Sequence, residues 1–221
     1  MIILKKTNTK KLVLLALLAA IAYLLAALID IRIIPAAPFL SYEPKDVVIT
    51  IGGFLLGPVA AFVISLVVAL LEMVTVSDTG IIGCLMNLLS TACFACTAAI
   101  IYKKKHSVGG AVLGLLVGSA AMVLSMLLWN WLITPLYTGT PREVVVSMLL
   151  PVFLPFNALK AGVNSAFILL LYKPLVTALR TTGLLPRQPK SGRSAKWGIY
   201  ILGVGLLFIC VLLVLILQGI I

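Results

Sequence analysis

The sequence predicts an all-α membrane protein that crosses the bilayer several times. Of its 221 residues, 62% are apolar and only 10% are charged, and the mean hydropathy is +1.24. Soluble domains carry about 25% charged residues, so this chain could not cover a water-facing surface. Its apolar residues also form runs that reach the roughly 20 residues a spanning helix needs. A soluble enzyme, a secreted disulfide scaffold and a disordered chain are therefore excluded.

The basic residues predict how the helices are oriented. The chain has 17 Lys and Arg against six Asp and Glu. Most of the bases fall in three stretches without an acid, which are Lys5 to Lys11, Lys103 to Lys105 and Arg180 to Lys196. Short basic loops between apolar runs lie on the cytoplasmic side of a membrane. We therefore expect a multi-pass protein of the cell membrane, with a cytoplasmic N-terminus, a lipid bilayer around it and no nucleic-acid partner.

The first predicted helix, Leu12 to Ile29, follows the basic N-terminus. It resembles a signal peptide, but it is long for one and many spans follow, so we expect it to be retained. Ala16 and Ala20 form an AxxxA motif on this helix, and small residues let helices approach closely in lipid. The motif predicts a surface that docks a partner. The alternative is packing within the chain, together with a neighbouring small-residue strip of Ala19, Ala22 and Ala26.

The next apolar stretch, Val47 to Thr75, is too long for one helix. Gly57-Pro58 interrupts it, and this pair suits the end of one helix and the start of the next. We predict a short helix over 45–56 and a full helix over 58–75, which keeps the basic loops on one side. The short helix would be roughly 18 Å long. Because the hydrocarbon core is roughly 30 Å thick, this segment must be sheltered by protein or line a cavity.

Three further helices complete a six-helix bundle. They are predicted over Ile81 to Tyr102, Gly109 to Ile133 and, after a polar outer loop from Thr134 to Glu143, from about Ser147 to Leu179. A last apolar run, Trp197 to Leu217, predicts an additional span with its C-terminus outside. The organisation is thus a membrane domain over 1–182, a basic cytoplasmic loop over 183–196 and an extra transmembrane helix over 197–221.

Polar side chains inside these helices gather near the outer side. Asn157, Lys160 and Asn164 share one helix face because of their spacing, and Glu72, Asn87 and Asn130 come from three other helices. A lysine at this depth costs roughly 2.5–3.5 kcal/mol to insert, and such residues tend to mark function. We predict a ligand pocket. The alternatives are a structural ion pair between Lys160 and Glu72, and asparagines that only bridge helices.

The outer loop from Ile31 to Pro44 is rich in proline and apolar residues, unlike a solvated loop. It is expected to fold down as a lid, with Phe39, Leu40 and Tyr42 covering an apolar ligand. An interfacial aromatic belt is the alternative. The chain lacks GxxxxGK[ST], HExxH and GxSxG motifs. We therefore expect a binding protein without catalytic residues, cofactor or metal, driven by energy from elsewhere.

Several motifs carry a resemblance to a known family, in order between about residues 8 and 182. They are Phe39-Leu40-Ser41-Tyr42-Glu43-Pro44-Lys45-Asp46, Gly52-Gly53-Phe54, Glu72-Met73, Thr79-Gly80, Met86-Asn87, Leu128-Trp129-Asn130, Thr134-Pro135, Leu154-Pro155-Phe156-Asn157, Lys160, Asn164 and Tyr172-Lys173-Pro174. With these motifs the chain resembles the RibU family of riboflavin-specific substrate-binding (S) components of energy-coupling factor (ECF) transporters.

The resemblance implies a six-helix fold that captures riboflavin from outside for ATP-driven uptake. Asn130, Asn157 and Lys160 match family positions that hydrogen-bond the flavin ring. The other expected ligand-binding residues are Glu72, Asn87, Trp129 and Asn164 in the helices, and Phe39, Leu40, Tyr42, Glu43 and Lys45 around the lid. The implied partners are a coupling membrane protein, which would meet the Ala16 and Ala20 surface, and two cytoplasmic ATPases.

Three other readings stay open at this point. The chain could be an S component for another vitamin or a flavin analogue. It could be a membrane enzyme that uses Glu72 and Lys160 as an acid–base pair, or a structural subunit without a small ligand. The family pattern ends near Arg180, so it implies no role for the last helix.

Overall fold

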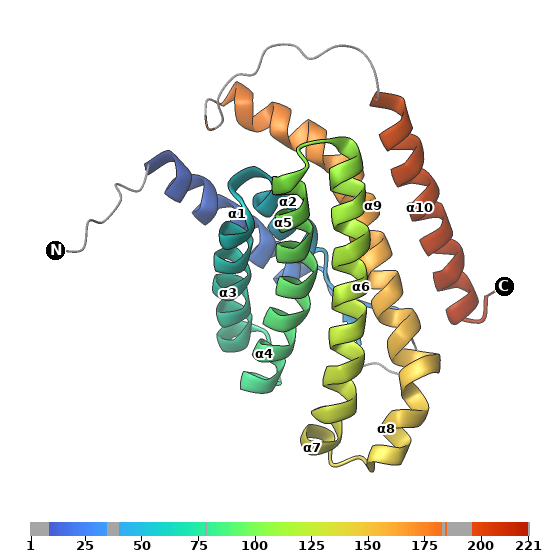
Figure 1. Cartoon of the computed structure of the whole chain (residues 1–221). Coiled ribbons are helices and arrows are strands. Elements are labelled where there is room, and N and C mark those ends of the chain that lie inside the picture. The colour runs from blue at the N-terminus through green and yellow to red at the C-terminus, as the bar shows by residue number, and fades with distance from the viewer. Residues whose placement is uncertain (1–8, 35–39, 78, 183, 185–195, 221) are drawn as a thin grey trace.

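The computed structural model of the chain describes residues 9–34, 40–77, 79–182, 184 and 196–220. It is a bundle of helices with one two-residue strand pair (Figure 1). The elements are α1 (Thr9–Leu28), β1 (Ile31–Arg32), β2 (Ser41–Tyr42), α2 (Lys45–Leu56), α3 (Pro58–Thr75), α4 (Gly80–Thr91), η1 (Ala92–Cys96), α5 (Thr97–Lys104), α6 (Val108–Leu132), α7 (Thr134–Thr138), α8 (Arg142–Met148), η2 (Leu149–Phe153), α9 (Leu154–Thr181) and α10 (Lys196–Leu217).

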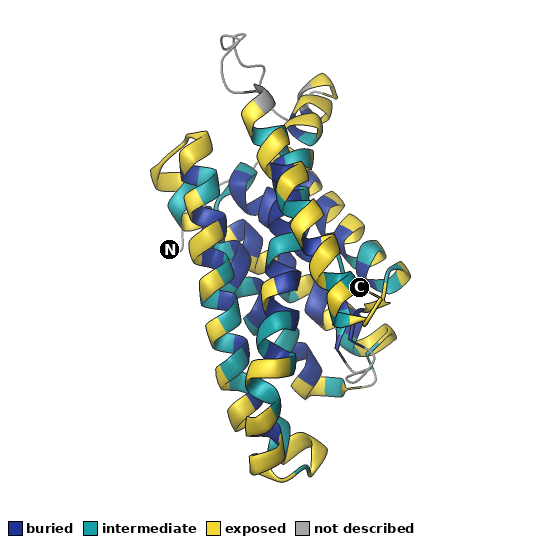
Figure 2. Ribbon diagram, turned by 90° about the vertical axis from the view of Figure 1, so that its right-hand side faces the viewer, coloured by how far each residue is buried: buried dark blue, intermediate teal, exposed yellow. Residues whose placement is uncertain are grey.

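Six helices in the described part of the chain are long and apolar enough to span a membrane. They cover Thr9–Leu28, Pro58–Thr75, Gly80–Lys104, Val108–Leu132, Arg142–Leu179 and Gly198–Leu217. The third of these joins α4, η1 and α5, and the fifth joins α8, η2 and most of α9, with a π-helical turn inside each. Exposed residues cover the outward faces of the bundle (Figure 2), and many are large and apolar. The predicted all-α, multi-pass fold is confirmed.

The short helix α2 lies inside the bundle. Every residue from Lys45 to Phe54 is buried, and α2 packs against α1, α3, α5 and α9. Gly57 turns the chain from α2 into α3 with a φ of +97°, a conformation that favours glycine. Protein therefore surrounds this segment, as its short length requires. The predicted bounds of α2 and α3 agree with the structure.

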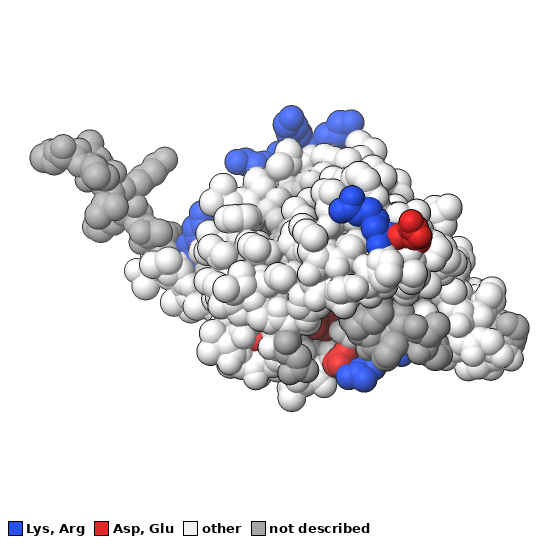
Figure 3. Space-filling view, turned by 90° about the horizontal axis from the view of Figure 1, so that it is seen from below, with Lys and Arg blue, Asp and Glu red and all other residues white. Residues whose placement is uncertain are grey.

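The two ends of the bundle differ. At one end, called here the basic end, α5 passes into α6 through a turn with exposed Lys103, Lys104 and Lys105. At the other, called here the hairpin end, lie the strand pair and the short helices α7 and α8 (Figure 1). In β1 and β2, Ile31 pairs with Tyr42 and Arg32 with Ser41. A view onto the hairpin end shows a largely uncharged surface on which some basic and a few acidic side chains are visible (Figure 3).

The prediction of a polar loop over 134–143 was wrong. This segment holds α7 and the start of α8, separated at Gly139, which has a φ of +69°. Pro141 directly precedes α8, where its fixed φ suits the entry into a helix, and Glu143 lies in the favourable first turn. These local signals outweigh the polar composition, so the last helix of the six-helix bundle begins earlier than Ser147.

The additional helix α10 packs on α9, on the opposite side of the bundle from α1 (Figure 1). A Cβ at Gly203 would lie 2.9 Å from Leu170, and one at Gly162 would lie 2.8 Å from the Cys210 sulfur. Glycine thus permits the close approach of the two helices. The predicted basic loop over 183–196 lies outside the described residues except for Leu184 and Lys196.

Candidate ligand-binding site

One face of α9 carries three polar residues into the bundle. Asn157, Lys160 and Asn164 are all buried, as their spacing predicts. They follow the π-helical turn η2, which precedes Pro155 at the start of α9. Pro155 has no backbone N–H to donate, so the regular hydrogen bonding of the helix is interrupted there. π-helical turns are frequent at functional sites. Here Asn157 Nδ2 donates to the Phe153 carbonyl oxygen at 2.8 Å, which holds the amide in place.

The carboxylate that faces these residues belongs to Asp46, which is 0% exposed. Its Oδ1 accepts a hydrogen bond from Thr91 Oγ1 at 2.7 Å. Its Oδ2 accepts one from Asn164 Nδ2 at 3.2 Å and lies 3.9 Å from Lys160 Nζ. The expected alternative of an ion pair between Lys160 and Glu72 was therefore wrong, since Asp46 is the acid that Lys160 faces.

Asp46 was missed as a site residue because the sequence places it at the start of a helix, after an outer loop. A charge there normally reaches water. The signal that would have found it is the shortness of the helix, since a segment sheltered by protein on all sides buries its first turn as well.

Glu72 belongs to a second group of charges around Lys45, called here the Lys45 cluster. Lys45 Nζ lies 2.7 and 2.6 Å from the two Glu72 carboxylate oxygens and 2.5 Å from Glu43 Oε2. Asn87 Nδ2 donates to Glu72 Oε2 at 3.1 Å. Four of the predicted ligand-binding residues thus contact one another in a buried ion cluster. Buried charges need such partners to offset their loss of hydration.

The described residues at both ends of the outer loop pack onto the bundle. Leu40 and Tyr42 are buried in a cluster that includes Phe153 and Phe156, and Tyr42 Oη donates to Asn164 Oδ1 at 3.0 Å. Burial, and secondly the charge of Asp46, raise the pKa of the Tyr42 hydroxyl far above its usual value, so it stays a donor. Phe39 lies outside the described residues.

Two further candidate residues lie at the end of α6. Asn130 is buried; its Nδ2 donates to the Met126 carbonyl oxygen at 2.7 Å and its Oδ1 accepts from Thr134 Oγ1 at 2.9 Å. Trp129 is partly buried against the core cluster that contains Met126. An amide nitrogen carries a second N–H, so Asn130 and Asn157 are oriented by their own helices while each retains donor capacity.

The small residues of α1 separate into two faces. Ala19, Ala22 and Ala26 are buried against the rest of the chain, so internal packing accounts for that strip. Ala16 and Ala20 are exposed. The AxxxA motif therefore faces the outside of the bundle, where it is available to another helix.

Comparison with known proteins shows which family this chain resembles. A family model described as the substrate-specific component of ECF transporters matches residues 10–172. The chain is 30% identical over 185 residues to "Riboflavin transporter RibU" of Staphylococcus aureus (strain TCH60), covering 78% of this chain and 94% of that protein. It is 28% identical over 186 residues to "Riboflavin transporter FmnP" of Bacillus subtilis (strain 168), covering 79% and 97%.

A solved structure agrees with these relatives. The structure described as "Structure and mechanism of the S component of a bacterial ECF transporter" superposes with a TM-score of 0.66 at 30% identity, over 78% of this chain and 98% of the other. The matching proteins are transport subunits, not enzymes, which removes the membrane-enzyme reading. The chain therefore belongs to the family of substrate-specific components of ECF transporters.

Proposed function

We propose that this chain is a riboflavin-binding S component that captures the vitamin for ATP-driven uptake. The observation that carries the proposal is the buried polar face of α9, where Lys160 faces Asp46 and lies on the same side as Asn157 and Asn164. Two of its relatives, from Staphylococcus aureus and Bacillus subtilis, are riboflavin transporters by name, and this face suits a flavin.

The chemistry of the flavin ring matches these side chains. The pyrimidine edge of the isoalloxazine alternates carbonyl acceptors with one N–H donor, and an Asn amide can both accept and donate. In our proposal Asn130 and Asn157 bind this edge, and the Lys160 ammonium donates to a ring carbonyl. The dimethylbenzene end of the ring then lies against apolar side chains, with Leu40 and Tyr42 of the lid over it.

The proposal includes an orientation and partners. The basic end lies in the cytoplasm, because exposed Lys103, Lys104 and Lys105 lie there and basic loops stay on that side. The lid and the α9 face then open to the outside, where the vitamin is captured. A coupling membrane protein docks on the exposed Ala16 and Ala20 of α1, and two cytoplasmic ATPases supply the energy.

Purified protein in detergent tests the ligand. We expect co-purified flavin in the visible spectrum, or quenching of riboflavin fluorescence on titration. Lys160→Ala and Asn157→Ala should each weaken this quenching, whereas Lys103→Ala, an exposed lysine at the basic end, should leave it unchanged. Folded protein that binds no flavin would overturn the riboflavin assignment and direct the search to other vitamins.

A further inference from the structure

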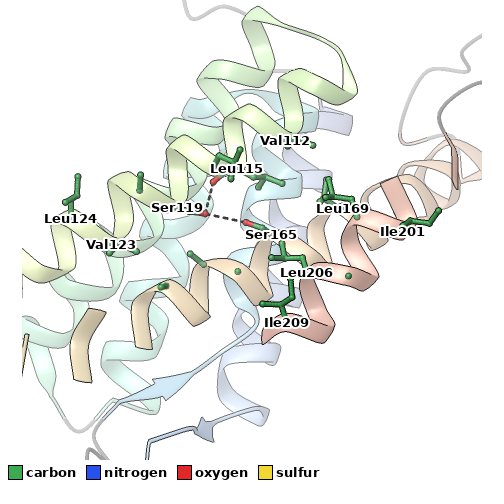
Figure 4. A pocket seen from close by; sticks show the side chains of 17 residues that line it. Val112, Leu115, Ser119, Val123, Leu124, Ser165, Leu169, Ile201, Leu206 and Ile209 are labelled. Carbon is green, nitrogen blue, oxygen red and sulfur yellow. Dashed lines mark hydrogen bonds between the residues drawn. The ribbon is translucent and has the colours of Figure 1, made fainter. Parts of the chain in front are cut away.

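An apolar groove runs along the bundle beside a different face of α9 from the one that carries Asn157, Lys160 and Asn164. Its walls are α6 and α10 and its floor is α9 (Figure 4). Its volume is about 880 Å³. Representative lining residues are Val112 and Leu124 of α6, Gly162 and Ser165 of α9, and Gly205 and Ile209 of α10. All three helices belong to the candidate membrane spans, so the groove lies at the depth of the lipid tails.

The groove exists because of how α10 packs. Both α6 and α10 pack against α9, and small side chains at the floor, such as Ala158, leave space between the two walls. A Cβ at Gly205 would meet nothing within 4 Å, so the α10 wall is open at that point. The family match ends at residue 172, and the groove therefore needs a helix that lies beyond the matched region.

The lining offers no polar recognition. It contains no charged residue, and its two hydroxyl groups belong to Ser119 and Ser165. Ser119 Oγ donates to the Leu115 carbonyl oxygen at 2.7 Å and lies 3.5 Å from Ser165 Oγ (Figure 4). Both hydroxyls are thus turned to partners within the protein. An occupant of this groove has no hydrogen bond to make, which describes a hydrocarbon.

The length and the position of the groove suit an acyl chain. Between Val112 and Leu124 the wall of α6 is roughly 18 Å long, and one leaflet is about half of the roughly 30 Å hydrocarbon core. Leu116 and Leu124 on the α6 wall and Ile209 on the α10 wall are strongly exposed. The groove therefore opens onto the lipid tails of a leaflet, and an extended acyl chain can lie along it.

We propose that this groove is a lipid site that holds an acyl chain of a bilayer phospholipid. An empty groove at this depth would cost its lining residues their dispersion contacts, and water finds no partner there. The occupant bridges α6 and α10 and joins the additional helix to the bundle through lipid as well as through α9. This inference does not depend on riboflavin being the substrate.

Photocrosslinking in vesicles tests the site. The full chain is reconstituted in phosphatidylcholine vesicles that contain a small fraction of phosphatidylcholine with a diazirine on one acyl chain. After irradiation, mass spectrometry maps the labelled residues. We expect labelling of Leu116, Leu124 and Ile209 to exceed that of Val59 and Val74, which are strongly exposed residues of α3 outside the groove.

A matched pair of variants on α10 separates the groove from the general lipid surface. A leucine replacing Gly205 projects into the groove, whereas Gly198 lies outside its lining and also has nothing within 4 Å of an added Cβ. Gly205→Leu should lower groove labelling several-fold, and Gly198→Leu should not. Ala120→Leu, from the α6 wall, should act like Gly205→Leu. Thermal unfolding checks that each variant is folded.

Three results would overturn the proposal. The first is labelling spread evenly over all lipid-facing helices. The second is an equal decrease in Gly205→Leu and Gly198→Leu. The third is a groove protected from the probe in a dimer that Gly205→Leu dissociates, which would assign the groove to a second copy of the chain. Riboflavin quenching is measured on the same samples, so a failure of the proposed function is recorded separately.

Discussion

The ammonium group of Lys45 contacts both carboxylate oxygens of Glu72, at 2.6 and 2.7 Å. Lys45 begins α2, and Glu72 lies in the last turn of α3. Gly57 joins the other ends of the same two helices. The ion pair thus closes the α2–α3 hairpin at the hairpin end of the bundle, and both of its side chains are buried. This geometry assigns the pair a role in stability.

Lys45→Met should destabilise the protein strongly. It leaves the buried Glu72 and the partly buried Glu43 without their cation, and removing one partner of a buried pair costs about 3–5 kcal/mol. Thermal unfolding in detergent measures the loss. The double variant Lys45→Met with Glu72→Leu should recover part of it, because no orphaned Glu72 carboxylate remains. Lys104→Met, at an exposed site, is the control; equal stability of Lys45→Met and this control would contradict the prediction.

Asp46→Asn should weaken riboflavin binding. The substitution keeps the size of the side chain but removes the negative charge that lies 3.9 Å from Lys160 Nζ. The Lys160 ammonium then loses the attraction that holds it in position. We expect a loss of affinity of roughly tenfold, which corresponds to about 1.4 kcal/mol, in fluorescence titrations. Asp30→Asn, whose side chain is 51% exposed, should bind normally. Unchanged affinity in Asp46→Asn would mean that Lys160 is held in another way.

Tyr42→Phe should speed the release of riboflavin while leaving the fold intact. The ring can keep its place in the apolar cluster, and only the hydrogen bond to Asn164 is lost. A hydrogen bond contributes about 0.5–1.5 kcal/mol net, so release should be roughly 2 to 12 times faster in stopped-flow measurements. A release rate equal to that of the unmodified protein would show that this contact does not hold the lid.

The hydrogen bond from Tyr42 to Asn164 should not change with pH up to about pH 9. Burial raises the pKa of Tyr42 above the ordinary value of 10.0, so the folded state favours the protonated phenol. The stabilising contribution of the protonated phenol is fully present below its pKa in the unfolded chain. It is lost as the pH rises through the pKa of the phenol in the folded protein. Release rates of unmodified protein and Tyr42→Phe should differ by a constant factor from pH 6 to 9. A ratio that falls within this range would argue against a buried phenol.

Ala16→Leu combined with Ala20→Leu should impair assembly with the coupling protein without affecting riboflavin binding. Both alanines are exposed on α1, so leucine adds bulk only where another helix would approach. Co-purification of the coupling module measures assembly. Gly198→Leu, on α10 across the bundle from α1 (Figure 1), should assemble normally. Full assembly of the double variant would remove α1 as the docking surface.

Cysteine labelling in intact cells tests the orientation. In a background with Cys84, Cys93, Cys96 and Cys210 replaced by alanine, Thr138→Cys at the hairpin end should react with a membrane-impermeant maleimide. Lys104→Cys at the basic end should react only after the cells are permeabilised. Both original residues are exposed. The reverse pattern would place the N-terminus outside and contradict the proposed direction of capture.

The sequence was sufficient to predict the spanning helices and α2, but not α7, the start of α8 or the charge pairing. Gly57-Pro58 and the charge pattern defined α2 and α3, and the spacing of Asn157, Lys160 and Asn164 defined the inward face of α9. The partners of Lys160 and Glu72 depend instead on where α2 lies in three dimensions. The shortness of α2 indicates that protein shelters it, but it does not say which helices cover its first turn, so Lys45 and Asp46 resembled interfacial charges. Likewise, nothing in the run from Trp197 to Leu217 specifies the groove that forms when α10 packs beside α6.

The burial of α2 has a consequence for how the protein enters the membrane. A helix of twelve residues, or roughly 18 Å, that starts with a lysine and an aspartate cannot remain in lipid alone, because its polar ends and charges would meet hydrocarbon. Its partners for those charges come from α3, α4 and α9, which are synthesised later. The final position of α2 in the bundle therefore depends on helices that follow it in the chain, with α9 the last of them.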